Sequence, residues 1–315
     1  MSAQVRVLPS HEGGLLVNVI KSNLLLLLTA AIWGLAFVAQ RVGMDHLGPF
    51  TFNGVRFMLG GLSLLPVLFV FQDKTQPLAK GLKDALVPGI LAGSILFIAA
   101  SLQQIGLVTT TAGKAAFITS LYLVLVPVIG IFVGHKARLS IWLGCMLAVS
   151  GLYLLCIKES FTIQPGDLME LIGALFWAFH ILIIGYFCRR VDPLKLSLLQ
   201  TVTCSILSLI VAVFTETIVV DNLMAAAAPL IYGGVFSVGI AYTLQIVGQQ
   251  YAPPAAAAII LSMETVFAAV GGFLLINETM NMREVIGCAL IFSGMLVSQL
   301  QDLRSHKAEV YQHSC

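Results

Sequence analysis

The most informative shortage in this sequence is of charge. Only 10% of the 315 residues are charged, with 17 basic and 15 acidic side chains, while 58% are hydrophobic. Soluble domains carry roughly a quarter charged residues, so the chain is not an ordinary soluble protein. A mean hydropathy of +0.97 also excludes a disordered chain. An integral membrane protein remains, and at about 20 residues per span the length suits about ten to twelve helices.

Several motifs are absent as well. The six cysteines include no Cys-x-x-Cys pair, so we expect neither a disulfide framework nor a metal site. The basic residues are scattered, which argues against a nucleic-acid partner. No Gly-x-Ser-x-Gly, His-Glu-x-x-His or Gly-x-x-x-x-Gly-Lys-Ser/Thr motif occurs. We therefore predict that the chain is not an enzyme and holds no cofactor. Any energy that the protein uses should come from an ion or substrate gradient rather than from ATP.

The apolar runs predict an all-α integral membrane protein. A 21-residue polar lead precedes the first run, and many similar runs follow, so this run is not predicted to be a cleaved signal peptide. No run shows the alternation of a membrane β-barrel. Windows of about 19 residues give ten candidate helices, at 22–41, 50–71, 84–107, 112–134, 139–157, 168–187, 195–214, 227–248, 253–276 and 284–301.

The basic residues sort the loops between two sides. If the N-terminus is cytoplasmic, 12 of the 17 lysines and arginines fall on inner segments and four on outer ones. Arg56 lies within a span. Cytoplasmic loops of membrane proteins are enriched in basic residues. The distribution predicts both termini in the cytoplasm and an even number of spans.

Two halves of the chain resemble each other. Trp33 matches Trp177 and Pro49 matches Pro193, both 144 residues apart. Further matches are Ser101-Leu102-Gln103 with Thr243-Leu244-Gln245, and Gly144-Cys145-Met146-Leu147 with Gly287-Cys288-Ala289-Leu290. These matches predict two five-helix units, 22–157 and 167–301, between tails 1–21 and 302–315. Because five is odd, the second unit must be inverted relative to the first, as in many secondary transporters.

Several short motifs occur along the apolar runs of both halves. They are Ala31-Ile32-Trp33-Gly34, Arg56-Phe57, Thr111 to Tyr122 with Pro127, Ala255 to Glu264, Gly271-Gly272, Asn277-Glu278, Gly287 and Gly294. On these motifs the chain resembles the drug/metabolite transporter superfamily, specifically its ten-helix EamA-type members, over residues 22–301. Two departures occur: Lys136 stands where the family often has a glutamate, which the second copy keeps as Glu278, and Thr265 follows Glu264 where proline is usual.

The resemblance implies a secondary active transporter that works by alternating access. Its partners are a small organic substrate, such as an amino acid, an amino-acid derivative or a drug, and the lipid bilayer. Export is favoured, proton coupling is one option, and the expected location is a bacterial cytoplasmic membrane. A nucleotide-sugar exchanger is an alternative, although Arg56 and Lys114 are few charges for a diphosphate. A membrane enzyme or receptor-like protein is an alternative of another class.

Ionisable residues inside apolar runs are candidate functional residues, because burying them in a membrane is costly. Glu264 is the deepest, about 15 Å along the helix from Pro254. It could couple to protons, recognise a cationic group or form a structural hydrogen bond. Arg56 could bind a substrate carboxylate, neutralise an acid or extend to the interface, and Lys114 lies nearer its loop. His180 could relay protons or bond to a backbone carbonyl.

Uncharged residues complete the candidate substrate or ion site. Trp33 and Trp177 lie well inside their spans, where they could stack on a substrate or pack in the core. Gln103 and Gln245 form another matched pair, and Tyr122 occupies the position that matches Glu264. Such polar groups could orient a zwitterion or join helices to each other.

Overall fold

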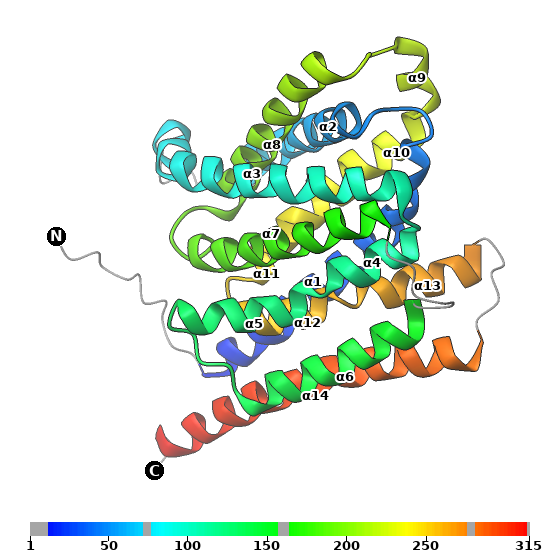
Figure 1. Cartoon of the computed structure of the whole chain (residues 1–315). Helices are drawn as coiled ribbons and strands as arrows, with labels where there is room; N and C mark the ends of the chain where they lie inside the picture. Colours follow the sequence, from blue (N-terminus) through cyan, green and yellow to red (C-terminus); the bar gives the residue numbers. More distant parts are fainter. Residues whose placement is uncertain (1–11, 72–76, 157–163, 276–280, 314–315) are drawn as a thin grey trace.

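The computed structural model describes residues 12–71, 77–156, 164–275 and 281–313, and these residues form helices and short connections without any β-strand (Figure 1). Residues 1–11 and 314–315 of the predicted tails lie outside the described residues, and so do Asn277 and Glu278. The all-helical prediction is confirmed for the part of the chain that is described.

The helices follow one another with short connections. The first half contains α1 (Glu12–Gly43), α2 (Pro49–Val70), α3 (Leu78–Thr109), α4 (Ala112–Ser120), α5 (Tyr122–Phe132) and α6 (Leu139–Cys156). The second half contains α7 (Pro165–Phe187), α8 (Pro193–Thr215), α9 (Val220–Ala225), α10 (Ala227–Ile231), the π-helix η1 (Tyr232–Ala241), α11 (Tyr242–Gly248), α12 (Pro254–Leu261), α13 (Glu264–Leu275) and α14 (Met282–His313).

Nine helical segments within the described ranges are long and apolar enough to cross a membrane, and Pro254–Val270 is a shorter apolar segment. Several predicted boundaries were wrong. Helix α1 begins at Glu12 and α14 continues to His313, so both helices extend into the predicted tails. Helix α3 begins at Leu78 rather than at residue 84. A hydropathy window finds the apolar part of a helix, whereas the helix itself can continue into polar surroundings.

Two further differences concern continuity. The predicted spans 112–134 and 253–276 are each interrupted, between α4 and α5 and between α12 and α13. The span predicted at 227–248 contains the π-helix η1, and the short helix α9 was not predicted. Side-chain hydroxyls explain one interruption: Ser262 Oγ donates to the Ile259 carbonyl at 2.8 Å, and Thr265 Oγ1 donates to the Ser262 carbonyl at 2.9 Å. Such bonds compete with the regular helix ladder.

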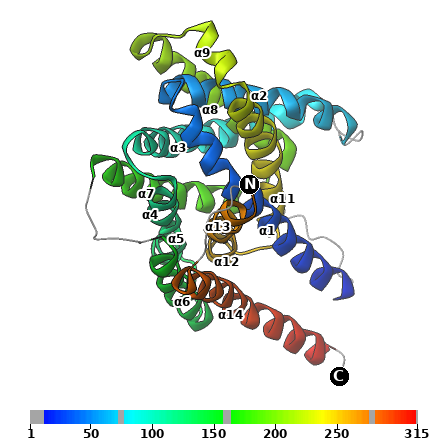
Figure 2. The same cartoon turned by 90° about the vertical axis from the view of Figure 1, so that its right-hand side faces the viewer.

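The helices pack around a central group. Helix α6 pairs with α14 along one edge, while α2, α3 and α8 pack together at the opposite edge (Figures 1 and 2). Helix α1 passes through the middle, where it contacts η1, α11 and α13. Helix α7 packs on α3, α4 and α5. Residues from both halves of the chain therefore surround the centre of the molecule.

Glycines set the close approach of α6 and α14. A Cβ atom on Gly144 would lie 2.8 Å from the Gly294 carbonyl oxygen, and one on Gly151 would lie 2.5 Å from that of Gly287. Real Cβ atoms do not approach so closely, so both contacts require glycine. The backbones meet here as they do where small residues join membrane helices.

Large apolar side chains cover much of the outer surface. Phe132 is 85% exposed and Phe214 is 84% exposed. A soluble monomer rarely exposes so much apolar surface, whereas lipid would cover it. Together with the span-length helices, this surface identifies an integral membrane protein.

The ends of the helices define two sides of the molecule. Helix α1 begins and α14 ends on the same side, at the left in Figure 1, which we call the terminus side. Helix α9 and the start of α2 lie on the other side, which we call the α9 side.

Candidate functional site

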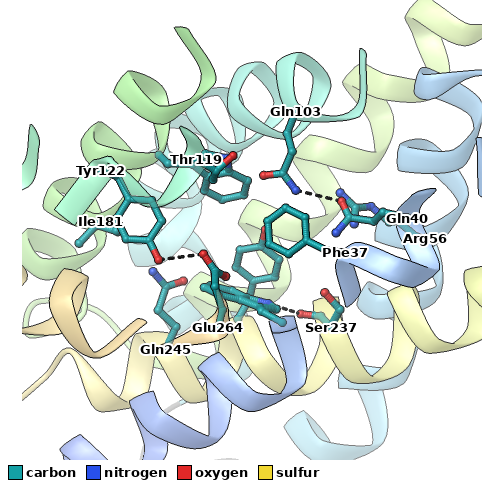
Figure 3. Close-up of a pocket in the computed structure, with 13 residues that line it drawn as sticks. Phe37, Gln40, Arg56, Gln103, Thr119, Tyr122, Ile181, Ser237, Gln245 and Glu264 are labelled. Carbon is teal, nitrogen blue, oxygen red and sulfur yellow. Dashed lines mark hydrogen bonds between the residues drawn. The ribbon is translucent and has the colours of Figure 1, made fainter. Parts of the chain in front are cut away.

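A pocket lies among the central helices and has about 470 Å³ of free volume, including space open to the outside. It is mainly aromatic and polar in character. Its lining comprises Trp33, Phe37, Gln40, Arg56, Gln103, Thr119, Tyr122, Trp177, Ile181, Ser237, Tyr242, Gln245 and Glu264 (Figure 3).

Glu264 and Tyr122 meet in this pocket. Glu264 is the first residue of α13 and Tyr122 the first of α5, so each follows a helix interruption. The Tyr122 hydroxyl donates to Glu264 Oε1 at 3.1 Å (Figure 3). Ser120 Oγ donates to the same oxygen at 3.4 Å. Glu264 is only 4% exposed. The two positions that the sequence comparison matched are thus in direct contact.

Three aromatic rings from different helices form one wall of the pocket. The Tyr242 ring centroid lies 4.9 Å from that of Trp33 and 6.3 Å from that of Trp177, the latter pair nearly parallel at 16°. Trp33 Nε1 donates to the carbonyl of Ser237, within η1, at 3.1 Å. Trp177 Nε1 is buried and has no hydrogen-bond partner among the described residues. This wall gives the pocket an aromatic surface, and Trp177 Nε1, which is unpaired in the described part of the chain, lies buried within it.

Arg56 lies inside the helix bundle and does not extend to the interface. It is 3% exposed, and its Nε donates to Asn53 Oδ1 at 2.9 Å. The guanidinium carbon lies 5.0 Å from the centroid of the Phe57 ring and 5.6 Å from that of Phe52, within the range of cation–π attraction. Within the described residues no carboxylate is in ion-pair distance of Arg56. Its charge is therefore available to a bound anion.

The glutamines occupy different surroundings. Gln103 Nε2 donates to Gln40 Oε1 at 3.1 Å (Figure 3). Gln104 Nε2 donates to the Gln40 carbonyl at 3.2 Å. Both bonds connect α3 to α1, and Gln103 and Gln40 also line the pocket. Gln245 also lines the pocket, and its Oε1 is buried without a partner among the described residues. That oxygen is a buried acceptor beside the pocket whose hydrogen-bonding capacity no described residue uses.

Two of the nine sequence-predicted residues do not line the pocket. His180 is fully buried behind Tyr242, with ring centroids 6.0 Å apart, and its Nε2 shares a hydrogen bond with Gln200 Oε1 at 3.0 Å. Lys114 forms an ion pair with Asp167 at the start of α7, toward the α9 side. The other seven line a single pocket, although the sequence could not show that they converge.

Sequence reasoning missed Tyr242, Gln40, Thr119 and Glu170. Tyr242 is uncharged and has no aromatic counterpart 142 residues earlier, where Ala100 stands. Glu170 lies near the start of a predicted span, although α7 begins earlier and the side chain is fully buried. An acid within the first two turns of a span was the available signal. Within the described residues, no three His, Cys, Asp or Glu side chains are grouped to hold a metal ion.

Comparison with known proteins agrees with this architecture. Residues 20–157 and 164–299 each match the EamA-like transporter family. An uncharacterized transporter of Archaeoglobus fulgidus is 33% identical over 306 residues, covering 95% of this chain and 92% of the relative. The uncharacterized transporter YoaV of Bacillus subtilis is 22% identical, covering 85% of this chain and 92% of the relative. A solved crystal structure with 18% identity has a TM-score of 0.74, covering 90% of this chain and 98% of that one.

The fold and the central pocket define a helical membrane transporter. The chain belongs to the EamA-like transporter family, within the drug/metabolite transporter superfamily. Members of this family are transporters and not enzymes. The predicted family and the prediction that the chain is not an enzyme are therefore both confirmed. A small-molecule substrate and a membrane location follow from this membership.

Proposed function

We propose that the protein is a secondary active transporter that exports a small organic solute by alternating access. The observation that carries the proposal is the central pocket in which Glu264 of α13 meets Tyr122 of α5. Both residues stand at helix interruptions, as binding residues do in transporters with discontinuous helices. Solute and proton would therefore meet at a single point, where two interrupted helices can change their relative positions.

We further propose that the chain has ten spans in two inverted repeats, 22–157 and 167–301. The helix interruptions support this arrangement, because they occur at matching positions of the two copies. Tyr122 and Glu264 are 142 residues apart, the same separation as Gln103 and Gln245. The glycine contacts between α6 and α14 also support it. In the structure Gly144 faces Gly294 and Gly151 faces Gly287. In the sequence comparison the partners are exchanged, because Gly144 matches Gly287 and Gly151 matches Gly294. Such reciprocal pairing is what a two-fold relation between the copies produces.

The terminus side is proposed to be cytoplasmic, in a bacterial or archaeal cytoplasmic membrane. The excess of basic residues on that side supports this orientation. Single cysteines can test it in a variant that lacks the native ones. Lys80→Cys, at the start of α3, should resist an impermeant thiol reagent in intact cells, whereas Asp221→Cys, in α9, should react. Labelling of both positions from outside would refute the proposed topology.

The chemistry of the pocket favours a zwitterion with an apolar or aromatic part. Arg56 can bind a carboxylate, Glu264 can bind an ammonium group or a proton, and Trp33 and Tyr242 can stack on a ring. An amino acid or an amino-acid derivative has all of these features, whereas a cationic drug has only the cationic group and the ring. A nucleotide-sugar exchanger is less well supported, because Arg56 is the only basic side chain that lines the pocket in the described part of the chain.

A flux assay tests the proposal. The purified protein in proteoliposomes should move a solute, identified by screening amino acids and drugs, when a pH gradient is applied. Glu264→Gln keeps the side-chain shape but cannot change charge, so pH-driven flux should fall by about 100-fold or more. The control Asp45→Asn removes an exposed carboxylate that pairs with Arg41 and should leave flux unchanged. Equal pH-driven flux in the wild type and Glu264→Gln would remove Glu264 from the mechanism.

A further inference from the structure

A second carboxylate is buried between the pocket and the α9 side. Glu170 lies in the second turn of α7 and is fully buried. Thr119 Oγ1 donates to Glu170 Oε2 at 2.8 Å, while Glu170 Oε1 has no partner among the described residues. A Cβ atom on Gly106 would lie 2.6 Å from that oxygen, so the glycine leaves room for the carboxylate. An acidic oxygen without a donor is costly to bury, and its most direct partner is a proton.

Glu170 lies between a partly exposed ion pair and the pocket. One turn earlier on α7, Asp167 pairs with Lys114, whose side chain is 18% exposed. Asp167 also accepts from Thr110 Oγ1 at 2.8 Å and from the Gln164 amide at 2.7 Å. On the other side of Glu170, Thr119 lines the pocket. Polar groups thus lead from the α9 side, through Glu170, to the pocket.

The last part of this route reaches Glu264. Ser120 follows Thr119 directly on α4, and its hydroxyl donates to Glu264 Oε1. The two buried carboxylates therefore accept from adjacent hydroxyl residues of one helix. Because α4 ends at Ser120, a change at either carboxylate acts on the same helix end.

The charges that surround Glu170 are few. Its own helix contributes Asp167 and α4 contributes Lys114, which pair with each other. Helix α5 contributes Tyr122, whose hydroxyl is bonded to Glu264. The charged residues of α3 lie at its distant start, the last of them Asp84, 22 residues before Gly106, or about 33 Å away. Helix α12 contributes only apolar residues. No cation on α3, α5 or α12 compensates Glu170 directly.

We propose that Glu170 is a second protonation site, which exchanges protons with the α9 side and sets the hydrogen-bond direction of Thr119 in the pocket. The inference rests on the proposed transport function. When Glu170 is ionised, the Thr119 hydroxyl donates to it and presents only lone pairs to the pocket. When a proton from water binds Glu170 Oε1, a rotation of the carboxyl group brings this O–H to Thr119 Oγ1 in place of Oε2, and the Thr119 proton is then free to turn toward a solute. Protonation on one side of the membrane thereby changes the pocket from acceptor to donor.

Infrared spectroscopy of the purified, unliganded protein tests the site without any substrate. A protonated carboxyl band should lose intensity as pH is raised from about 4 to about 9, in the wild type, in Glu264→Gln and in the surface control Asp45→Asn. The band component assigned to Glu170 should be missing in Glu170→Gln. An unchanged set of carboxyl bands in Glu170→Gln would refute protonation of Glu170.

Transport assays test the coupling. Glu170→Gln should reduce pH-driven accumulation by about 100-fold, yet leave the exchange of labelled for unlabelled solute without a gradient intact. Thr119→Val should also reduce pH-driven accumulation, and Thr119→Ser should restore the wild-type accumulation, because serine keeps the hydroxyl. If Glu170→Gln does not fold, the two Thr119 variants decide the question. Normal pH-driven accumulation in Thr119→Val would refute the inference.

The outcomes separate this inference from the proposed function. If no solute moves in the wild type, the transport proposal fails, while the infrared band still reports on Glu170. If Glu264→Gln abolishes pH-driven flux and Glu170→Gln does not, transport stands and only the Glu170 inference fails.

Discussion

The contact between α1 and the first turn of α13 gives a quantitative prediction about the site. A Cβ atom on Gly34 would lie 2.5 Å from the Glu264 carbonyl oxygen, 2.8 Å from the Ala268 amide nitrogen and 2.9 Å from Phe267 Cβ. Ordinary contacts begin at 3.4 Å. The variant Gly34→Ala must therefore move α1 and α13 apart by about 0.9 Å, which is the difference between 3.4 and 2.5 Å. Backbone atoms on both sides leave no flexible side chain to absorb the shift.

The displacement should reduce both stability and binding. Overpacking a well-packed contact costs about 1–3 kcal/mol. It also moves Glu264, whose bond from the Tyr122 hydroxyl is already 3.1 Å long and would exceed the hydrogen-bonding range after such a shift. We expect a lower unfolding temperature and weaker solute binding together.

The matched control is Gly61→Ala, also in a helix interior. A Cβ atom there would meet only Val202 Cγ2 at 3.5 Å and Thr201 Cγ2 at 3.7 Å, which are ordinary contacts. Both variants gain the same helix propensity, so their difference reports the overpacking alone.

A thiol-reactive dye can follow unfolding, because Cys145 and Cys204 are buried in the folded protein. Gly34→Ala should melt about 2–10 °C below Gly61→Ala. Equal melting temperatures would show that α1 and α13 are not in the close contact described above.

Three further predictions concern other contacts. The Glu216 carboxylate accepts from two backbone amides at the start of α2, at 2.9 and 2.7 Å. Glu216→Ala removes this carboxylate and should lower the unfolding free energy by about 0.5–2 kcal/mol in thermal melts, and Glu216→Gln should partly restore it. A double-mutant cycle with Lys114→Met and Asp167→Asn should give a coupling energy of about 0.5–3 kcal/mol from unfolding measurements, and additive effects would refute the ion pair. Trp33→Phe removes the donor to the Ser237 carbonyl and should cost about 0.5–1.5 kcal/mol of stability, with no loss expected if that bond does not form.

Some of the site could be predicted from the sequence because burying a charge in a membrane is costly. Glu264 and Arg56 were found as charges within apolar runs, and the structure places both in the pocket lining. His180 was selected by the same rule, yet it lies behind Tyr242 and bonds to Gln200. The rule finds a buried polar group that needs a hydrogen-bond partner. It does not say whether that group bonds to a neighbouring helix or faces the pocket.

The sequence by itself determined the membrane class, the approximate spans and the family. Insertion into a bilayer depends on local hydropathy, and hydropathy is a sum over neighbouring residues. Only the tertiary structure decided which helix faces meet at the centre. In a membrane helix the face toward lipid and the face toward the core are both apolar, so periodicity does not distinguish them. For this reason the contact of Tyr122 with Glu264, the wall around Tyr242 and the buried Glu170 became visible only when the helices were packed.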